Sequence, residues 1–155
     1  MGIPRSLYAH IEKRLHARDY AEIAKASREL MNSRGDALNL KSPTLSGAGG
    51  KGGVSDRVGD SVERVIEAEE RLGRALRWQA VYAQLDEAFD GTAEGEVAQM
   101  LYRDKVTSQQ ISALRGCDRQ TVRRLRDTYV THAALLAAEQ GLIRMREYAE
   151  RGGAK

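Results

Sequence analysis

Five arginines are concentrated in one short stretch of the chain, from Arg115 to Arg126, which contains a single acidic residue. The 155-residue chain has a formal charge of only +3, so this basic charge is local. Guanidinium groups pair with phosphates and with the O6 and N7 atoms of guanine, and the neighbouring Gln120 has the amide group that pairs with adenine. These residue types, gathered in one place, predict binding to double-stranded DNA.

The same stretch has the pattern of two short helices joined by a tight turn. Thr107 or Ser108 offers a hydroxyl oxygen that caps the free N–H groups of a first helix. Gly116 ends that helix, because glycine adopts the left-handed backbone conformation that a sharp turn needs. Asp118 then caps a second helix, which carries most of the arginines. This arrangement predicts a helix-turn-helix, the motif whose second helix enters the major groove of DNA.

The apolar residues of the stretch fit this motif with one exception. The expected inner residues are Ile111, Val122, Leu125 and Tyr129, with Ser112 and Cys117 small enough for close packing. Arg115 occupies a position that is usually apolar, and we expect Leu114 to take its place one residue earlier. In that case either the first helix is slightly rotated or Arg115 reaches a phosphate.

The expected DNA contacts are of two kinds. Bases in the major groove are read by the outer side chains of the second helix, and phosphates are bound by the first turn of the first helix and by flanking side chains. The base-reading set is Arg119, Gln120, Arg123 and Arg124, and the backbone-contacting set is Thr107, Ser108, Arg115, Thr121 and Arg126. A single helix-turn-helix is small for a lone reader of DNA, so we expect two half-sites, and hence a homodimer, or a protein partner.

Apolar residues recur at intervals of three and four over most of the chain, which predicts an all-α protein. We divide it into a helical N-terminal segment (1–38), a linker rich in Gly, Ser and Pro (39–55), a long amphipathic helix (56–89) and a helix-turn-helix domain (90–150). The apolar stripe of the N-terminal segment loses phase between Leu15 and Tyr20. The helix there either bends near Ala17 to Asp19 or changes partner.

The long helix carries an apolar seam that it cannot bury alone. The seam comprises Val58, Val62, Val65, Ile66, Leu72, Leu76, Val81, Leu85 and Phe89. The simplest partner is the N-terminal helix, folded back through the linker into an antiparallel pair, and the next simplest is a second copy of the chain. Trp78 and Tyr82 near its end are interpreted as packing residues, because aromatic side chains at helical spacing usually belong to a core.

Catalytic, metal-binding and nucleotide-binding patterns are missing from the sequence. His10, His16 and His132 have no metal-ligand spacing with each other or with Cys117. The GGKGG segment around Lys51 lacks both the hydroxyl residue and the preceding strand of a phosphate-binding loop. We therefore expect a protein that is not an enzyme and uses no cofactor or metal.

The composition also bears on the cellular compartment. The chain has one cysteine, so no intrachain disulfide is possible. It contains no run of eighteen apolar residues, and its first ten residues lack the apolar core of a signal peptide. These features predict a cytoplasmic protein that is not embedded in a membrane.

The segment QMLYRDKVTSQQISALRGCDRQTVRRL resembles region 4 of bacterial sigma-70 factors, the four-helix unit that reads the −35 promoter element. Its matching residues are Tyr102, Thr107, Ile111, Gly116, Thr121 and Val122. The upstream layout of a helical segment, a glycine-rich linker and a long helix is similar to phage-encoded regulators of the RinA and ArpU type. The resemblance implies a phage or prophage regulator that acts with the RNA polymerase of a bacterial host. Sigma regions 2 and 3 have no counterpart here.

Two other classes of protein are compatible with the pattern. The first is a phage terminase small subunit, a DNA-packaging adaptor that combines a helix-turn-helix with oligomerising helices, although its DNA-binding unit commonly lies near the N-terminus. The second is a helical adaptor that binds no DNA and whose basic face is simply solvated. A ring-shaped particle would favour the first, and failure to bind DNA at low salt would favour the second.

Overall fold

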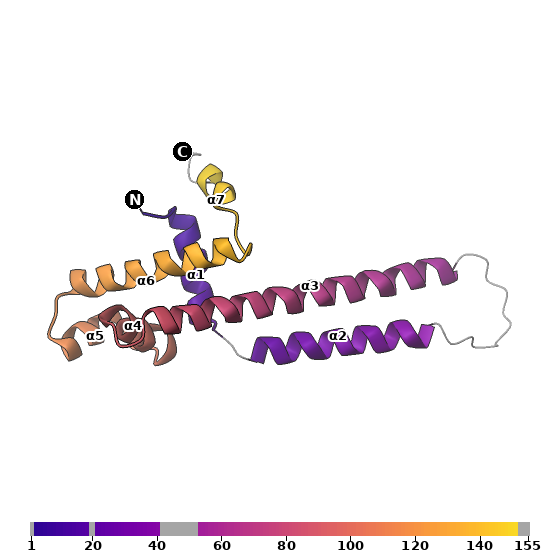
Figure 1. The fold of residues 1–155 in the computed structure, drawn as a ribbon, viewed down its shortest axis with the longest axis horizontal. Helices are drawn as coiled ribbons and strands as arrows, with labels where there is room; N and C mark the ends of the chain where they lie inside the picture. The colour runs from indigo at the N-terminus through magenta and orange to yellow at the C-terminus, as the bar shows by residue number, and fades with distance from the viewer. Residues whose placement is uncertain (1, 19–20, 41–52, 152–155) are drawn as a thin grey trace. The chain divides into compact units, whose positions relative to one another are not determined.

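The computed structural model describes residues 2–18, 21–40 and 53–151, and within them the regular structure is entirely helical (Figure 1). The α-helices are α1 (Arg5–His16), α2 (Ala21–Leu40), α3 (Gly53–Ala88), α4 (Ala93–Ala98), α5 (Ser108–Arg115), α6 (Arg119–Glu139) and α7 (Met145–Arg151). A π-helix, η1 (Gln99–Arg103), follows α4 directly. The predicted all-α class is confirmed. Among the described helices, none is both long and apolar enough to cross a membrane.

The chain is divided into two compact units. The larger unit comprises Met1–Asp19 and Arg77–Lys155, and the smaller unit comprises Tyr20–Leu76, so that the boundary falls within α3. This division differs from the expected one, because the N-terminal segment 1–38 is shared between the units. Helix α1 ends at His16 and α2 begins at Ala21, which is where the apolar stripe loses phase. The change of partner accounts for that loss of phase.

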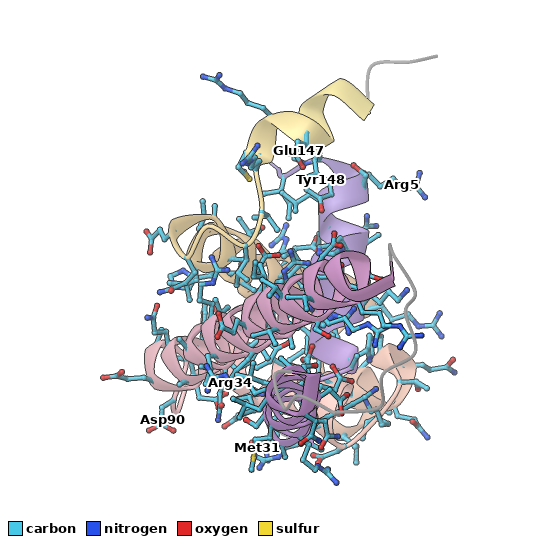
Figure 2. The ribbon with its side chains drawn as sticks, turned by 90° about the vertical axis from the view of Figure 1, so that its right-hand side faces the viewer. Arg5, Met31, Arg34, Asp90, Glu147 and Tyr148 are labelled. Carbon is cyan, nitrogen blue, oxygen red and sulfur yellow. The ribbon has the colours of Figure 1, made fainter. Side chains whose placement is uncertain are left out.

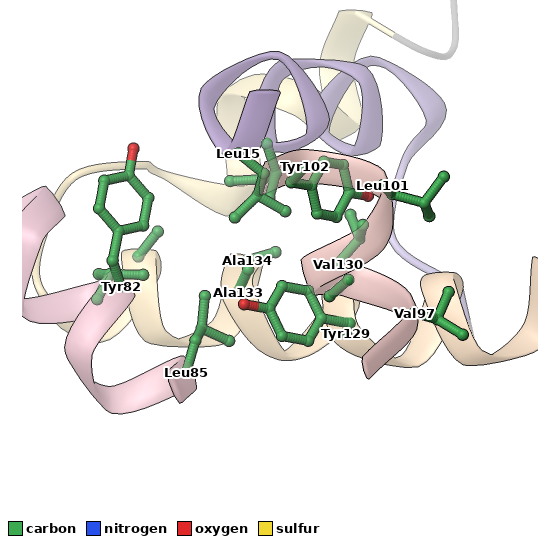
Figure 3. Packing of buried hydrophobic residues seen from close by; sticks show 14 of the residues in the cluster. Leu15, Tyr82, Leu85, Val97, Leu101, Tyr102, Tyr129, Val130, Ala133 and Ala134 are labelled. Carbon is green, nitrogen blue, oxygen red and sulfur yellow. The ribbon is translucent and has the colours of Figure 1, made fainter. Parts of the chain in front are cut away.

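Helix α1 belongs to the larger unit because its apolar stripe is deeply buried there. Leu7, Ile11 and Leu15 are spaced by four residues and are almost completely buried. They join the buried face of α6, where Ala133 and Ala134 are small enough to let the two helices approach closely. Figure 3 shows Leu15 beside Tyr102 and above the alanines of α6.

The last part of α3 also contributes to this core. Val81 and Leu85 are fully buried, and Trp78 and Tyr82 are nearly so, which confirms the prediction that these aromatic residues pack. The hydroxyl of Tyr82 donates a hydrogen bond to the backbone oxygen of Arg14, 3.2 Å away. This bond ties α3 to the C-terminal turn of α1.

Helix α4 begins close against the end of α3. Thr92 caps α4 by accepting a hydrogen bond from the backbone N–H of Gly95, 3.1 Å away. A Cβ atom at Gly95 would lie 2.1 Å from the backbone oxygen of Phe89, so only glycine fits there. The π-helix then turns Leu101 and Tyr102 into the core, where Tyr102 stacks near Tyr129 of α6. Helix α6 thus packs against α1 and α4, and η1 reaches it through Tyr102.

In the smaller unit, α2 and the first part of α3 run antiparallel. Arg34 pairs with Glu69 at 2.8 Å, and Arg71 pairs with Glu29 at 3.5 Å, so the numbering along the two helices runs in opposite directions. The side chains buried between them are mostly small: Ala26, Leu30, Ser61, Ala68 and Ala75. The α3 residues among them do not belong to the predicted apolar seam of this helix.

Part of the predicted seam is solvent-exposed, so α2, which is the simplest of the two expected partners, does not cover it. The exposed members in the smaller unit are Val58, Val62, Ile66 and Leu76. Of the expected linker at 39–55, residues 41–52 lie outside the described part of the chain, and the flanking helices extend into both of its ends.

Candidate nucleic-acid interface

Helix α5 begins and ends, and helix α6 begins, where the sequence predicted. Thr107 caps α5 in a capping box, in which its hydroxyl accepts from the N–H of Gln110 and the Gln110 side chain accepts from the N–H of Thr107. Gly116 has φ +61° and ends α5 in the left-handed conformation. Asp118 caps α6 by accepting from the N–H of Thr121 at 2.7 Å. The predicted caps at Thr107 and Asp118 and the predicted helix end at Gly116 are therefore confirmed.

The inner face of this pair of helices is closely packed. Ile111 of α5 and Val122 of α6 are completely buried, and Tyr129 is nearly so. The hydroxyl of Ser112 donates to the backbone oxygen of Cys117 and so holds the turn against α5. These contacts fix the start of α6 relative to α5, and the outer side chains of α6 therefore project from a rigid support.

The expectation for Leu114 and Arg115 is wrong. Leu114 is 71% exposed and does not replace a core residue, whereas the Arg115 side chain is only 26% exposed and forms an ion pair with Glu96 of α4. The carboxylate satisfies the guanidinium, so Arg115 occupies the usually apolar position as half of a pair. Its charge is directed toward α4.

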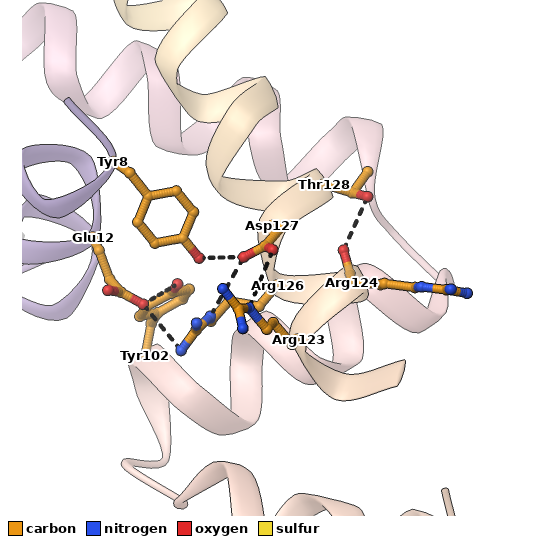
Figure 4. A network of polar contacts seen from close by, with 8 residues as sticks. All are labelled: Tyr8, Glu12, Tyr102, Arg123, Arg124, Arg126, Asp127 and Thr128. Carbon is orange, nitrogen blue, oxygen red and sulfur yellow. Dashed lines mark hydrogen bonds and ion pairs between the residues drawn. The ribbon is translucent and has the colours of Figure 1, made fainter. Parts of the chain in front are cut away.

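The four expected base-reading residues lie together on the outer face of α6. Arg119, Gln120, Arg123 and Arg124, with Asp127, line a shallow depression in the surface. All four are exposed, and in the described part of the chain no ion pair is formed by Arg119 or Arg124. Figure 4 shows Arg124 extending away from the neighbouring helices. The depression is therefore positively charged and accessible.

Arg126 points in the opposite direction, toward α1. Its side chain is 28% exposed and lies 3.6 Å from the Oε1 atom of Glu12 and 3.9 Å from the Oδ1 atom of Asp127 (Figure 4). Its guanidinium carbon also sits 5.8 Å from the centre of the Tyr8 ring. Arg126 was expected to contact DNA, and here it joins α6 to α1.

Tyr8 of α1 reaches the edge of the basic depression through Asp127. Its hydroxyl donates a hydrogen bond to Oδ1 of Asp127 at 2.7 Å. Burial and this hydrogen bond raise the pKa of Tyr8 above its usual value, so the hydroxyl remains a donor at neutral pH. The other oxygen of Asp127 lies 3.8 Å from Nε of Arg123. Tyr8 thus orients a carboxylate that faces a candidate base-reading side chain.

The other residues that were expected to contact the DNA backbone, Thr107, Ser108 and Thr121, lie at the capped starts of α5 and α6. The N–H of Thr121 is bound by Asp118, and this hydrogen bonding from Thr121 lowers the pKa of the Asp118 carboxyl below its usual value. The hydroxyl and N–H of Thr107 are both used in the capping box, and Ser108 follows as the first residue of α5. These three residues stand at helix starts and do not line the depression on α6.

Several residues around the arginines were not identified from the sequence. Asp127 follows Arg123 by four residues, a spacing that brings side chains together on a helix and was available as an indication. Tyr8, Glu12 and Glu96 had no such indication, because their proximity to α5 and α6 depends on tertiary packing. These side chains determine which arginines of α5 and α6 are held by the protein and which remain available to a partner.

This arrangement provides charge and hydrogen-bond donors for binding a polyanion. Within the described ranges, no three His, Cys, Asp or Glu side chains are grouped so as to hold a metal ion. No family model matches the sequence, and no significant match is found among curated proteins or solved structures.

Proposed function

We propose that this chain is a sequence-specific DNA-binding transcription regulator, in which α5 and α6 form a helix-turn-helix of the sigma-70 region 4 type. Helix α6 is the recognition helix and enters the major groove with its outer face. The observation that carries the proposal is the exposed group of Arg119, Gln120, Arg123 and Arg124 on one face of a helix whose opposite face is buried.

The roles of these side chains follow from their chemistry. Arginine donates two parallel hydrogen bonds to guanine, and Gln120 pairs with adenine in the same groove. Asp127 adds an acceptor at the edge of the group, where it restricts the orientation of Arg123. Thr107, Ser108 and Thr121 lie at helix starts, where the positive end of the helix dipole favours a phosphate. Arg115 and Arg126 support this surface and do not form part of it.

The wider context of the proposal rests on the resemblance of the sequence. A regulator of the RinA or ArpU type is encoded by a phage or prophage and acts in the cytoplasm of a bacterial host with its RNA polymerase. The antiparallel pairing of α2 with the first part of α3 is compatible with the upstream layout on which this resemblance rests. In this proposal, it serves for assembly and leaves DNA reading to α6.

A random-oligonucleotide selection with the full chain tests the proposal. We expect enrichment of one motif, with loss of that enrichment when Arg119, Arg123 and Arg124 are all changed to Gln. Each arginine that reads a base is expected to contribute about 1–3 kcal/mol toward the preferred site.

The matched control changes Arg5, Arg144 and Arg146 to Gln, which removes the same charge from exposed positions on α1, just before α7 and within α7. It should retain the motif with slightly weaker binding. Absence of any enriched motif in the wild-type protein, or equal effects of the two triple variants, would contradict the proposal.

A further inference from the structure

An apolar stripe on the smaller unit is exposed to solvent. On α3 it comprises Val58, Val62, Ile66 and Leu76, which are between 39% and 52% exposed. At 100° per residue, these four positions fall within an arc of about 80° around the helix. On α2, Met31 and Leu38 are 71% and 66% exposed and seven residues apart, so they too share one side of their helix.

The two sets lie on the same face of the helix pair. Viewed from the N-terminus of each helix, each stripe lies about 110° clockwise from the residues buried between α2 and α3. Because the helices are antiparallel, the same rotation points both stripes to one side of the pair. Figure 2 shows Met31 and Arg34 on a common side of α2. The two stripes therefore face the same side of the pair, and the Arg34–Glu69 ion pair lies on that side between them.

The contacts within the smaller unit bury little apolar surface. Leu30 is the only large side chain among the residues buried between α2 and α3 in the described part of the chain. A two-helix pair that buries alanine and serine while exposing six larger apolar residues gains little free energy from its own core. Covering the exposed face would supply the missing apolar contact.

We propose that a second copy of this chain covers this face, with the two α3 helices antiparallel about a two-fold axis. The charged residues along the outer edge of the stripe favour a second copy as the partner. Three acidic residues, Glu63, Glu67 and Glu70, are followed there by the basic residue Arg74. An antiparallel copy places Glu67 of one chain beside Arg74 of the other, and Ile66 beside Leu76. A parallel copy would place like charges together.

The resulting assembly is a four-helix bundle made from two helix pairs. Each copy contributes the same surface, as a two-fold interface requires. The interface lies entirely within α2 and α3, so the inference goes beyond the proposed DNA binding and does not depend on it. A dimer would also provide two copies of α6 if that proposal holds.

Sedimentation equilibrium of the full chain over a range of concentrations tests the dimer. We expect a mass of twice the 17.1 kDa chain mass. Changing Ile66→Lys should weaken dimerisation by about tenfold or more, because it places a charge in an apolar interface. The control Asp36→Lys also introduces a lysine into the smaller unit, at an exposed position on α2 about 150° around the helix from Met31 and Leu38, and should leave the dimer intact.

A charge exchange tests the antiparallel arrangement. Glu67→Arg and Arg74→Glu should each weaken the dimer by roughly fivefold, because each creates two like-charge contacts across the axis. The double variant restores both contacts and should recover the wild-type affinity. Circular dichroism checks that the helix content of each variant is unchanged.

Three results would overturn the proposal. The first is a wild-type chain that is monomeric at every concentration, which would leave the face for another protein. The second is a dimer that Ile66→Lys does not weaken. The third is a double variant whose dimer is as weak as those of the single variants.

Discussion

The outer and inner faces of the α5–α6 pair carry the same residue type in two different environments. On the outer face, Arg119 and Arg124 make no ion pair with described residues, and Arg123 is 74% exposed. On the inner side, Arg115 and Arg126 are each bound to a carboxylate from another element, Glu96 and Glu12 respectively. The number of arginines in a segment therefore overstates the charge that is available to a partner. Here, two of the five arginines are paired with carboxylates of other helices and stabilise the fold.

The largest expected effect concerns the support beneath the outer face. Ile111 is fully buried, so Ile111→Ala should lower the free energy of unfolding by about 2–5 kcal/mol. Leu114→Ala on the exposed side of the same helix should change it by no more than about 0.5 kcal/mol. Chemical denaturation followed by circular dichroism measures both. Similar losses would mean that the two faces of α5 are not distinguished by burial.

The turn between the two helices should give the next largest effect. Gly116 has φ +61°, and Gly116→Ala places a side chain in this left-handed conformation at a cost of about 1–2 kcal/mol. Gly59→Ala adds a Cβ to a helical glycine that also has open space around it, and it should be neutral or stabilising. A tolerated Gly116→Ala would show that the turn adopts another conformation.

The ion pair on the inner side should contribute less. Both partners are about one quarter exposed, so Glu12→Gln should reduce the unfolding free energy by up to about 1 kcal/mol. Glu147→Gln removes a more exposed acid on α7, and its effect should be smaller. If Glu12→Gln has no effect on stability, Arg126 is not anchored as described, and the contrast between the faces weakens.

The smallest effect concerns pH. Hydrogen bonding from Thr121 lowers the pKa of Asp118, so its contribution to stability is present above the usual carboxyl pKa and is lost as the pH falls through the lowered value. Asp118→Asn keeps a capping group without the titration, and its melting temperature should therefore fall less between about pH 5 and pH 3. Asp104→Asn serves as control. Parallel pH profiles for wild type and Asp118→Asn would contradict this assignment.

Much of the fold was predictable because it depends on local chemistry. Helix caps at Thr107 and Asp118 and the turn at Gly116 are properties of single residues and their immediate neighbours. The helical spacing of apolar residues likewise predicted an all-α chain. The break after His16 appeared only as a change of phase, which left two interpretations open.

The pairing of helices was less predictable because it depends on contacts across the chain. Leu7, Ile11 and Leu15 gave a buried stripe without indicating that α6 covers it. The same limit explains the error at Leu114 and the assignment of Arg126 to DNA, since Glu96 and Glu12 come from other elements. Spacing identifies a face of a helix, and only tertiary structure identifies what lies against it.

The most direct test compares how salt affects DNA binding by Arg124→Gln and Arg126→Gln. Fluorescence anisotropy with a fixed duplex gives the slope of log K against log salt concentration for each full-length variant. Loss of one phosphate contact reduces the magnitude of this slope by about 0.9, whereas loss of a base contact reduces affinity for a preferred site with less change in slope. We expect Arg124→Gln to weaken binding in one of these ways and Arg126→Gln to leave both slope and affinity unchanged. Equal losses for the two variants, or no DNA binding by the wild-type chain at low salt, would contradict the account.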